Sequence, residues 1–289
     1  MLGRGFVNRY YEISRDKDSF LCVGLDPVTD AMREGYVIPS SLTSRYGEVE
    51  GIKKFSLDVI KAVAPYTPII KPNAQFLVYP FSFNDLKEMV DTIHEGGCLA
   101  LLDAKLSDIG STNEAALYWI DRIGFDGVTF SPFPGYENGS DVVYNWSKEK
   151  DKGIFVLCRM SNPGAHDYQS EEMGGEALYL KLAADAHHHG SNGYVVGCTA
   201  PSELGEIRGI IGEDPLILSP GLGPQGGDPK ESLKLGANSR GEGLLVSSSR
   251  SIDFAYEGLG WSSDRYADAA AKMAKKKRDE LNELKRSIF

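Results

Sequence analysis

Eight short apolar runs recur along the chain between longer stretches with helical spacing, and this alternation limits the fold more than any other feature. The runs are apolar on both faces, as strands of a parallel sheet covered by helices are. They predict strands at residues 20–25, 69–76, 98–104, 127–131, 154–160, 194–198, 216–219 and 243–247. Eight parallel strands that are each followed by a helix close naturally into a barrel. The predicted fold is therefore α/β, a single (β/α)₈ TIM barrel, with a doubly wound open sheet as the main alternative.

The stretches between the runs carry apolar residues at the three- and four-residue spacing of helices. This spacing predicts helices at residues 51–63, 84–95, 112–123, 176–189, 201–211 and 229–235, with a weaker one at 140–148. A charged, amphipathic helix at 263–285 should pack outside the barrel, and an extra segment precedes the first strand. No repeat, low-complexity tract or Pro/Ser-rich linker divides the chain. We therefore expect one domain spanning residues 1–289.

Composition excludes several classes of partner. The formal net charge of −10 argues against a nucleic-acid surface, because phosphate backbones are bound through clustered Lys and Arg. No apolar stretch is long enough to span a bilayer, so no membrane partner is expected. The four cysteines lie in apolar runs without CxxC or Cys/His spacing, which predicts buried reduced thiols, no metal and a cytoplasmic location.

Charged side chains gather where the first three predicted strands end. Alternation along the third strand places Asp103 and Lys105 on one face, and the same parity in the second strand pairs Lys71 with Asn73. The first strand ends at Asp26, another carboxylate that should point inward. Burying a charged side chain costs roughly several kcal/mol of folding free energy unless the charge is paired with others. A cluster of them at the carboxyl end of a barrel, where active sites lie, therefore indicates function.

A phosphate site is predicted after the last two strands. Barrels commonly bind phosphate there, through Gly-rich turns with exposed N–H groups and an arginine. The loop at residues 219–227 contains four glycines, and residues 247–251 carry four serines and Arg250. Because the global charge repels an anionic substrate, such a local concentration of donors and positive charge is needed.

The segment 103–112, with the sequence DAKLSDIGST, resembles the DxKxxDIGxT signature of orotidine 5′-phosphate decarboxylases, specifically the longer-chain branch of that family. Further matching segments appear in the family's order at residues 22–27, 71–73, 161–165, 196–199 and 220–227. The resemblance covers roughly residues 20 to 252.

The resemblance implies a homodimer of barrels that converts orotidine 5′-monophosphate to UMP and CO₂, the last step of de novo UMP synthesis, without a metal or organic cofactor. The implied catalytic residues are Lys71, Asp103 and Lys105, completed by Asp108 from the other subunit. The implied substrate-binding residues are Asp26 and Asn73 at the ribose, Ile109 and Thr112 from the other subunit, Met160 and Ser161 near the pyrimidine, and Pro220, Gln225, Ser249 and Arg250 at the phosphate. The chain departs from the family at Met160, where some members carry a hydroxyl residue, and at Ser249, where glycine is frequent.

The difficulty of this reaction favours Lys105 as the central residue. Loss of CO₂ from C6 of orotate leaves an electron pair in the ring plane, where the ring π-system cannot delocalise it. A protein must then stabilise the carbanion electrostatically, and a lysine beside C6 can both do so and deliver a proton. Two other readings stay open: a Mg²⁺-dependent sugar-phosphate decarboxylase or an aldolase of the same barrel group, and a non-catalytic nucleotide-binding barrel.

Overall fold

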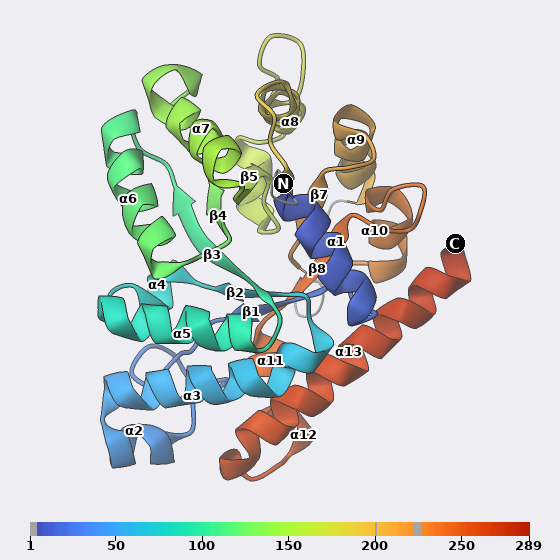
Figure 1. Ribbon diagram of the computed structural model, residues 1–289. Helices are drawn as coiled ribbons and strands as arrows, with labels where there is room; N and C mark the ends of the chain where they lie inside the picture. Colours follow the sequence, from blue (N-terminus) through green and yellow to red (C-terminus); the bar gives the residue numbers. More distant parts are fainter. Residues whose placement is uncertain (1–4, 200, 222–226) are drawn as a thin grey trace.

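The computed structural model describes residues 5–199, 201–221 and 227–289, and its eight parallel strands form a closed barrel in sequence order (Figure 1). The strands are β1 (Leu21–Leu25), β2 (Ile69–Pro72), β3 (Leu99–Leu106), β4 (Gly127–Phe130), β5 (Gly153–Arg159), β6 (Gly193–Val196), β7 (Leu216–Ser219) and β8 (Leu244–Ser248). β8 pairs with β1 through Leu21, Cys22 and Val23, which closes the sheet. The predicted (β/α)₈ barrel is confirmed, and the open sheet is wrong.

The predicted helices form the outer layer of the barrel (Figure 1). They are α3 (Glu48–Val63), α5 (Phe83–Glu95), α6 (Gly110–Ile123), α7 (Asp141–Lys150), α8 (Leu178–His188), α9 (Pro201–Ile211), α10 (Pro229–Gly236) and α13 (Tyr266–Ile288). The long α13 packs its small residues, among them Ala269, Ala270 and Ala274, against the outside of the barrel as expected. Among the described residues, no helix is both long and apolar enough to cross a bilayer.

Several shorter elements were not predicted. They are α1 (Phe6–Asp16), α2 (Ser40–Tyr46), α4 (Ala74–Leu77), α11 (Arg250–Asp253) and α12 (Ala255–Leu259), with 3₁₀ turns at Ala64–Tyr66, Pro163–Asp167 and Ser263–Arg265 and a wide turn at Tyr136–Ser140. Most are a few residues long, so each contains too few apolar positions to show a helical period.

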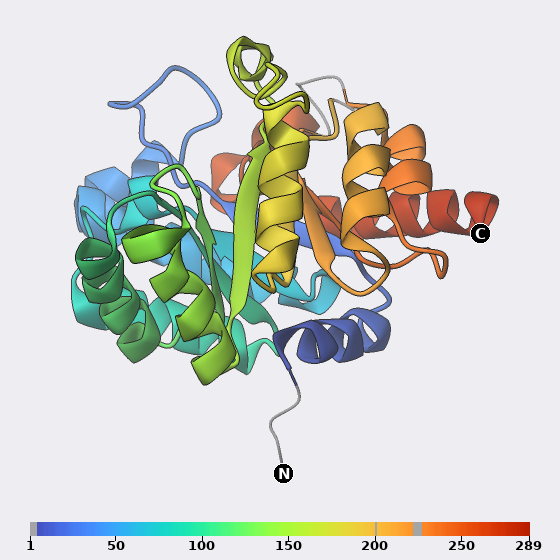
Figure 2. The same ribbon diagram turned by 90° about the horizontal axis from the view of Figure 1, so that it is seen from above.

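The helix α1 closes the amino-terminal end of the barrel (Figure 2). Its Phe6 and Tyr10 join the interior side chains of the strands in one apolar cluster, and the Phe6 ring meets the Phe155 ring edge-on at 6.0 Å. A Cβ atom at Gly153 would lie 2.5 Å from the Phe6 ring, so only glycine allows this approach. With this end filled, the opposite end is left for a ligand.

The predicted second strand is four residues too long. We expected residues 69–76, but β2 ends at Pro72, and Ala74–Leu77 form α4. The Asn73 side chain accepts a hydrogen bond from the Gln75 N–H and so caps α4. Because proline has no N–H to continue the ladder, the strand ends where the cap begins.

Candidate active site

A pocket of about 350 Å³ opens at the carboxyl ends of the strands. Its lining includes eight residues that the sequence singled out: Asp26, Lys71, Asn73, Asp103, Ser161, Pro220, Ser249 and Arg250. Gly221, Ser247, Ser248 and Ser251, which belong to the two segments of the predicted phosphate site, line it too, and Arg33, Phe76 and Phe254 are lining residues that sequence reasoning missed. The fold thus brings residues from most of the chain's length to one mouth, on the side of the barrel where active sites are built.

Three charged side chains form a continuous array at this mouth. Lys71 Nζ donates to Asp103 Oδ2 at 2.7 Å, and Lys105 Nζ lies 2.8 Å from Asp103 Oδ1. The side chain of Lys71 is 9% exposed and that of Lys105 is 38% exposed. Lys71 thus lines the pocket beside Asp103 but is largely buried, while Lys105 is the more exposed ammonium of the array and lies outside the pocket lining.

The array holds its charges firmly. Burial by itself would raise the pKa of Asp103, but Lys71 and Lys105 hold that pKa well below its usual range. Burial likewise opposes the charge on Lys71, yet the carboxylates of Asp103 and Asp26 raise its pKa above the ordinary value. The site consequently keeps a fixed pattern of two ammonium groups around one carboxylate at neutral pH.

Lys105 reaches the array through an irregular backbone. Its φ angle is +52°, a left-handed conformation that is uncommon outside glycine, and the β3–β4 register shifts between Leu102 and Leu106. The prediction that Lys105 lies beside Asp103 is confirmed, but strict alternation fails as the reason. Thr129, which is 1% exposed, donates to Asp103 Oδ1 at 2.8 Å and accepts from the Lys105 N–H at 3.0 Å.

Thr129 is therefore a functional candidate that the sequence analysis did not identify. One hydroxyl fixes both the Asp103 carboxylate and the Lys105 backbone. The available signal was that Thr129 is the one polar residue in the short buried strand Gly127–Phe130. Backbone strain of the kind seen at Lys105 gathers at functional sites, where surrounding contacts hold it in place.

Asp26 and Asn73 lie together beside the array. The Asn73 Nδ2 group donates to Asp26 Oδ1 at 3.0 Å, and an isolated bridge pairs the Asn73 backbone with Asp103. Both residues therefore line the pocket on one side, as strand parity predicted. Their oxygen and amide groups can serve a ligand with adjacent hydroxyls.

Asp253 is a second unpredicted carboxyl near the pocket. It is fully buried in α11, and its Oδ2 accepts a hydrogen bond from the Asp26 N–H at 3.0 Å. Its Oδ1 has no partner among the described residues. Burial, then the negative charge of Asp26, raises the pKa of Asp253 well above its ordinary value, although Lys71 and Arg33 oppose the shift. Burial therefore favours the protonated form of this carboxyl in the folded protein.

Replacement of Asp253 by asparagine should make stability less dependent on pH. A folded-state pKa above the unfolded value means that the folded state binds the extra proton, so stability falls as pH rises from the unfolded value of about 4 toward the folded one. The loss from one such group is at most about 1.4 kcal/mol per pH unit. Between pH 5 and 8, D253N should lose less free energy of unfolding than the unaltered protein in urea titrations. Equal losses in both proteins would contradict a protonated Asp253.

The phosphate-end candidates surround the rest of the pocket. Pro220, Ser249 and Arg250 line it, and so does Ser161 from the loop after β5. β1 passes very close to Ser249, since a Cβ atom at Gly24 would lie 2.0 Å from Ser249 Oγ. Gln225 falls outside the described residues.

Five sequence candidates within the described residues do not line this pocket: Lys105, which joins the array through Asp103, and Asp108, Ile109, Thr112 and Met160. Asp108, Ile109 and Thr112 are exposed where α6 begins, and Ile109 is 59% exposed. In the described part of the chain, the Asp108 carboxylate accepts a hydrogen bond from the neighbouring Ile109 N–H alone, at 2.7 Å. Met160 is half-buried, and its N–H donates to Gln169 Oε1. Asp108, Ile109 and Thr112 therefore take no part in the array of their own chain.

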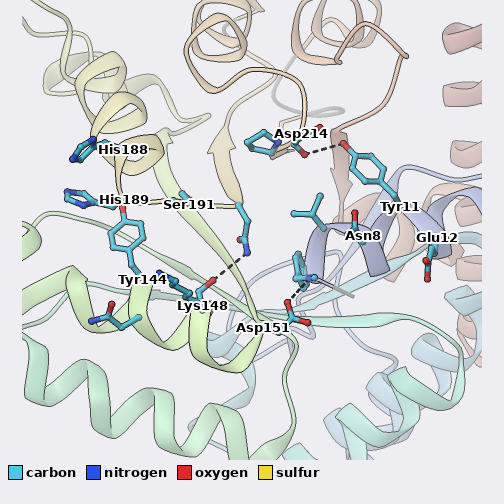
Figure 3. Close-up of a pocket in the computed structure, with 18 of the residues that line it drawn as sticks. Asn8, Tyr11, Glu12, Tyr144, Lys148, Asp151, His188, His189, Ser191 and Asp214 are labelled. Carbon is cyan, nitrogen blue, oxygen red and sulfur yellow. Dashed lines mark hydrogen bonds between the residues drawn. The ribbon is translucent and has the colours of Figure 1, made fainter. Parts of the chain in front are cut away.

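A larger hollow of about 1210 Å³ lies at the amino-terminal end of the barrel, between α1 and the segments that precede β5, β6 and β7 (Figure 3). Its polar groups bond to one another: Asp151 Oδ1 accepts from the Phe6 N–H, and Tyr11 OH donates to the Asp214 carbonyl. His189 stacks on Tyr136 with ring centres 3.6 Å apart. Across residues 5–199, 201–221 and 227–289, no group of three or more His, Cys, Asp or Glu could hold a metal ion. Size alone therefore does not make this hollow the active-site candidate.

Comparison with known proteins agrees with the geometry. The model of the Orotidine 5'-phosphate decarboxylase / HUMPS family matches residues 19–256. The chain is 36% identical over 275 residues to the orotidine 5′-phosphate decarboxylase of Azoarcus sp. (strain BH72), covering 93% of this chain and 95% of that relative. Among solved structures it is similar to the OMP decarboxylase of Leishmania donovani, with a TM-score of 0.77, 26% identity and coverage of 98% of this chain and 100% of that one. It is also similar to the UMP synthase of that organism, with a TM-score of 0.77 and 29% identity, covering 97% of this chain but 56% of that one.

Proposed function

This chain belongs to the orotidine 5′-phosphate decarboxylase family, and we propose that it converts orotidine 5′-monophosphate to UMP and CO₂ at the carboxyl end of its barrel. The observation that carries the proposal is the Lys71–Asp103–Lys105 array, whose Lys71 and Asp103 line the same pocket as Arg250. The same pocket therefore offers charged groups for the pyrimidine ring that carries the carboxylate, and a separate cation for the phosphate.

Lys105 performs the central step in this proposal. The bond between C6 and the carboxylate breaks, CO₂ leaves, and the bonding electron pair stays on C6. The Lys105 ammonium stabilises that pair and then transfers one proton to C6, which gives UMP and a neutral amine that solvent reprotonates. The 38% exposure of Lys105, against 9% for Lys71, supports this choice between the two lysines.

Asp103, Lys71 and Thr129 position Lys105. Asp103 pairs with both ammonium groups, and Thr129 holds both the carboxylate and the Lys105 backbone. Because these groups are ordered before substrate binds, little reorganisation is needed as charge develops on C6. Asp103 would also lie near the departing carboxylate and repel it, which favours loss of CO₂.

Asp26 and Asn73 bind the ribose in this proposal, and Arg250 with the serines after β8 binds the phosphate. In this proposal Ser161 faces the pyrimidine and Pro220 and Gln225 belong to the phosphate end, whereas Met160 does not line the pocket. The phosphate is distant from the reacting carbon, so its binding energy assists the reaction by orienting the ring over Lys105.

We further propose that the active enzyme is a homodimer in which Asp108, Ile109 and Thr112 complete the site of the other subunit. These residues are exposed where α6 begins and do not contact their own array. The helices α4, α5 and α6 lie side by side on the outside of the barrel (Figure 1). They line an apolar hollow of about 590 Å³ with exposed Val78, Tyr79, Phe83 and Trp119. Exposed apolar surface of this kind is typical of protein interfaces.

The chain is proposed to act as one domain in the cytoplasm. All four cysteines are buried, and burial raises the pKa of the Cys22 thiol to about 12. Such thiols are unreactive and fit a reducing compartment.

A direct ultraviolet assay tests the proposed function. Orotidine 5′-monophosphate is added in the presence of excess EDTA, and the absorbance change that accompanies conversion to UMP is followed. We expect turnover at the same rate with and without the chelator. Loss of activity in EDTA would favour the Mg²⁺-dependent sugar-phosphate enzymes, and no turnover in either condition would favour the non-catalytic barrel.

A further inference from the structure

We propose that Arg33 binds the substrate phosphate together with Arg250, as a second guanidinium presented by the loop between β1 and α2. The proposal rests on the function proposed above and adds to it a binding residue that lies more than 200 positions from Arg250 in the sequence. Arg33 and Arg250 both line the 350 Å³ pocket.

The loop that carries Arg33 is fixed to the same part of the fold as Arg250. The Tyr36 and Val37 N–H groups donate to the two oxygens of Glu257, at 2.9 and 3.1 Å. Tyr256 OH donates to the Val37 carbonyl at 2.5 Å. Both partners belong to α12, which directly follows the helix that begins with Arg250. The loop therefore has one defined position over the pocket.

The turn of the loop directs Arg33 into the pocket. Gly35 and Tyr36 both have positive φ angles, +66° and +52°, which reverse the chain. Their carbonyl groups then accept hydrogen bonds from the Arg33 guanidinium, Gly35 from Nε at 3.1 Å and Tyr36 from Nη2. The guanidinium lies 5.3 Å from the centre of the Phe254 ring, and Phe254 is a pocket residue.

The Arg250 guanidinium is held by the same loop. It lies 5.8 Å from the centre of the Tyr36 ring, so the loop that carries Arg33 also contacts Arg250. Each guanidinium rests on an aromatic face, which orients it, and the Nη1 group of Arg33 is left for a ligand because Nε and Nη2 donate to the loop carbonyls.

The two cations have no carboxylate partner in the part of the chain that the structure describes. Among the described residues, neither Arg33 nor Arg250 makes an ion pair with a carboxylate within 4 Å, and no hydrogen bond is formed by Nη1 of Arg33. Burial, then the positive charge of Arg250, lowers the pKa of Arg33, while Asp26, Glu257 and Asp253 act in the opposite direction. A doubly charged phosphate between the guanidiniums would relieve this repulsion and satisfy their free N–H groups.

The test compares binding of UMP with binding of uridine, which lacks only the phosphate. Calorimetric titrations are made on the whole protein and on the R33M, R250M and R33K variants. We expect R33M to weaken UMP binding by about 10- to 100-fold, the usual range for a charge-assisted pair, and to leave uridine binding unchanged. R33K, which keeps the charge but loses the planar donor edge, should lie between R33M and the unaltered protein.

R45M is the matched control. Arg45 also lies on an aromatic ring, that of Tyr46 at 5.1 Å, but it does not line the pocket, so R45M should bind UMP normally. If R33M keeps full UMP affinity while R250M loses it, the role of Arg33 is refuted. Equal weakening of UMP and uridine would also refute it, because the loop rather than the phosphate would then be affected. Absence of turnover in the unaltered protein would instead count against the proposed function, which the ultraviolet assay measures separately.

Discussion

Replacement of Lys105 by alanine is expected to lower kcat by roughly 10⁴- to 10⁶-fold, because it removes both a general acid and the electrostatic stabiliser of the carbanion. The substrate ribose and phosphate are bound by other groups in our proposal, so UMP should still bind measurably. Lys105 is 38% exposed and contributes no apolar packing to the barrel core, so the variant should fold. Single-turnover kinetics and UMP titration of the same preparation check both expectations.

Two further variants test whether the loss of activity is specific to proton transfer by Lys105. One keeps the positive charge at this position, and the other removes a lysine outside the site. K105R keeps a positive charge beside Asp103, but a guanidinium does not release its proton at neutral pH, so this variant should also be severely impaired. K181A removes an exposed lysine of α8 that pairs with Asp185 at 3.2 Å, and it should retain normal kcat. A K105A enzyme that turns over within tenfold of the unaltered protein would disprove the mechanism.

The part of the site that could be predicted follows from regular strands. Alternation placed Asp103 on the interior face of β3, where Leu99 and Leu101 also lie, because that strand is regular up to Leu102. The same parity placed Lys71 and Asn73 correctly, because β2 runs parallel to β3 and the Asn73–Asp103 bridge continues their pairing. Strand count and parity thus sufficed to place Lys71 beside Asp103, but not to explain the position of Lys105.

The irregular features depend on contacts that no local pattern encodes. The positive φ angle of Lys105 goes with the Thr129 hydroxyl that accepts its N–H, and Thr129 belongs to the next strand. Arg33 enters the pocket because Glu257, more than 200 residues later, fixes its loop. Neither contact leaves a periodic signal in the sequence.

The burial of Asp253 is another feature that the sequence does not reveal. A lone aspartate beside Arg250 in the sequence has the appearance of a solvated surface charge, yet it is fully buried beneath Asp26. Asp253 is buried because α11 packs back onto the barrel after β8. An apolar residue would have indicated a buried position in the sequence, whereas an aspartate does not.

A heterodimer that combines the K105A and D108A lesions is expected to recover about half of the normal activity, although each homodimer is nearly inactive. The reason is geometric. If Asp108 serves the site of the other subunit, one site of the heterodimer carries both lesions and the other carries neither. The two chains are co-expressed with different affinity tags, the heterodimer is purified through both tags, and kcat is measured per dimer.

The matched control combines K105A with D103A. Both residues belong to the array of their own chain, since Lys105 and Asp103 lie 2.8 Å apart in one barrel. Each site of this second heterodimer therefore carries one lesion, and activity should stay near background. Recovery in the first heterodimer but not the second would distinguish a shared site from an effect of mixing. A first heterodimer as inactive as its parents, or a protein that sediments as a monomer while active, would show that Asp108 does not act across an interface, and the exposed position of α6 would then need another explanation.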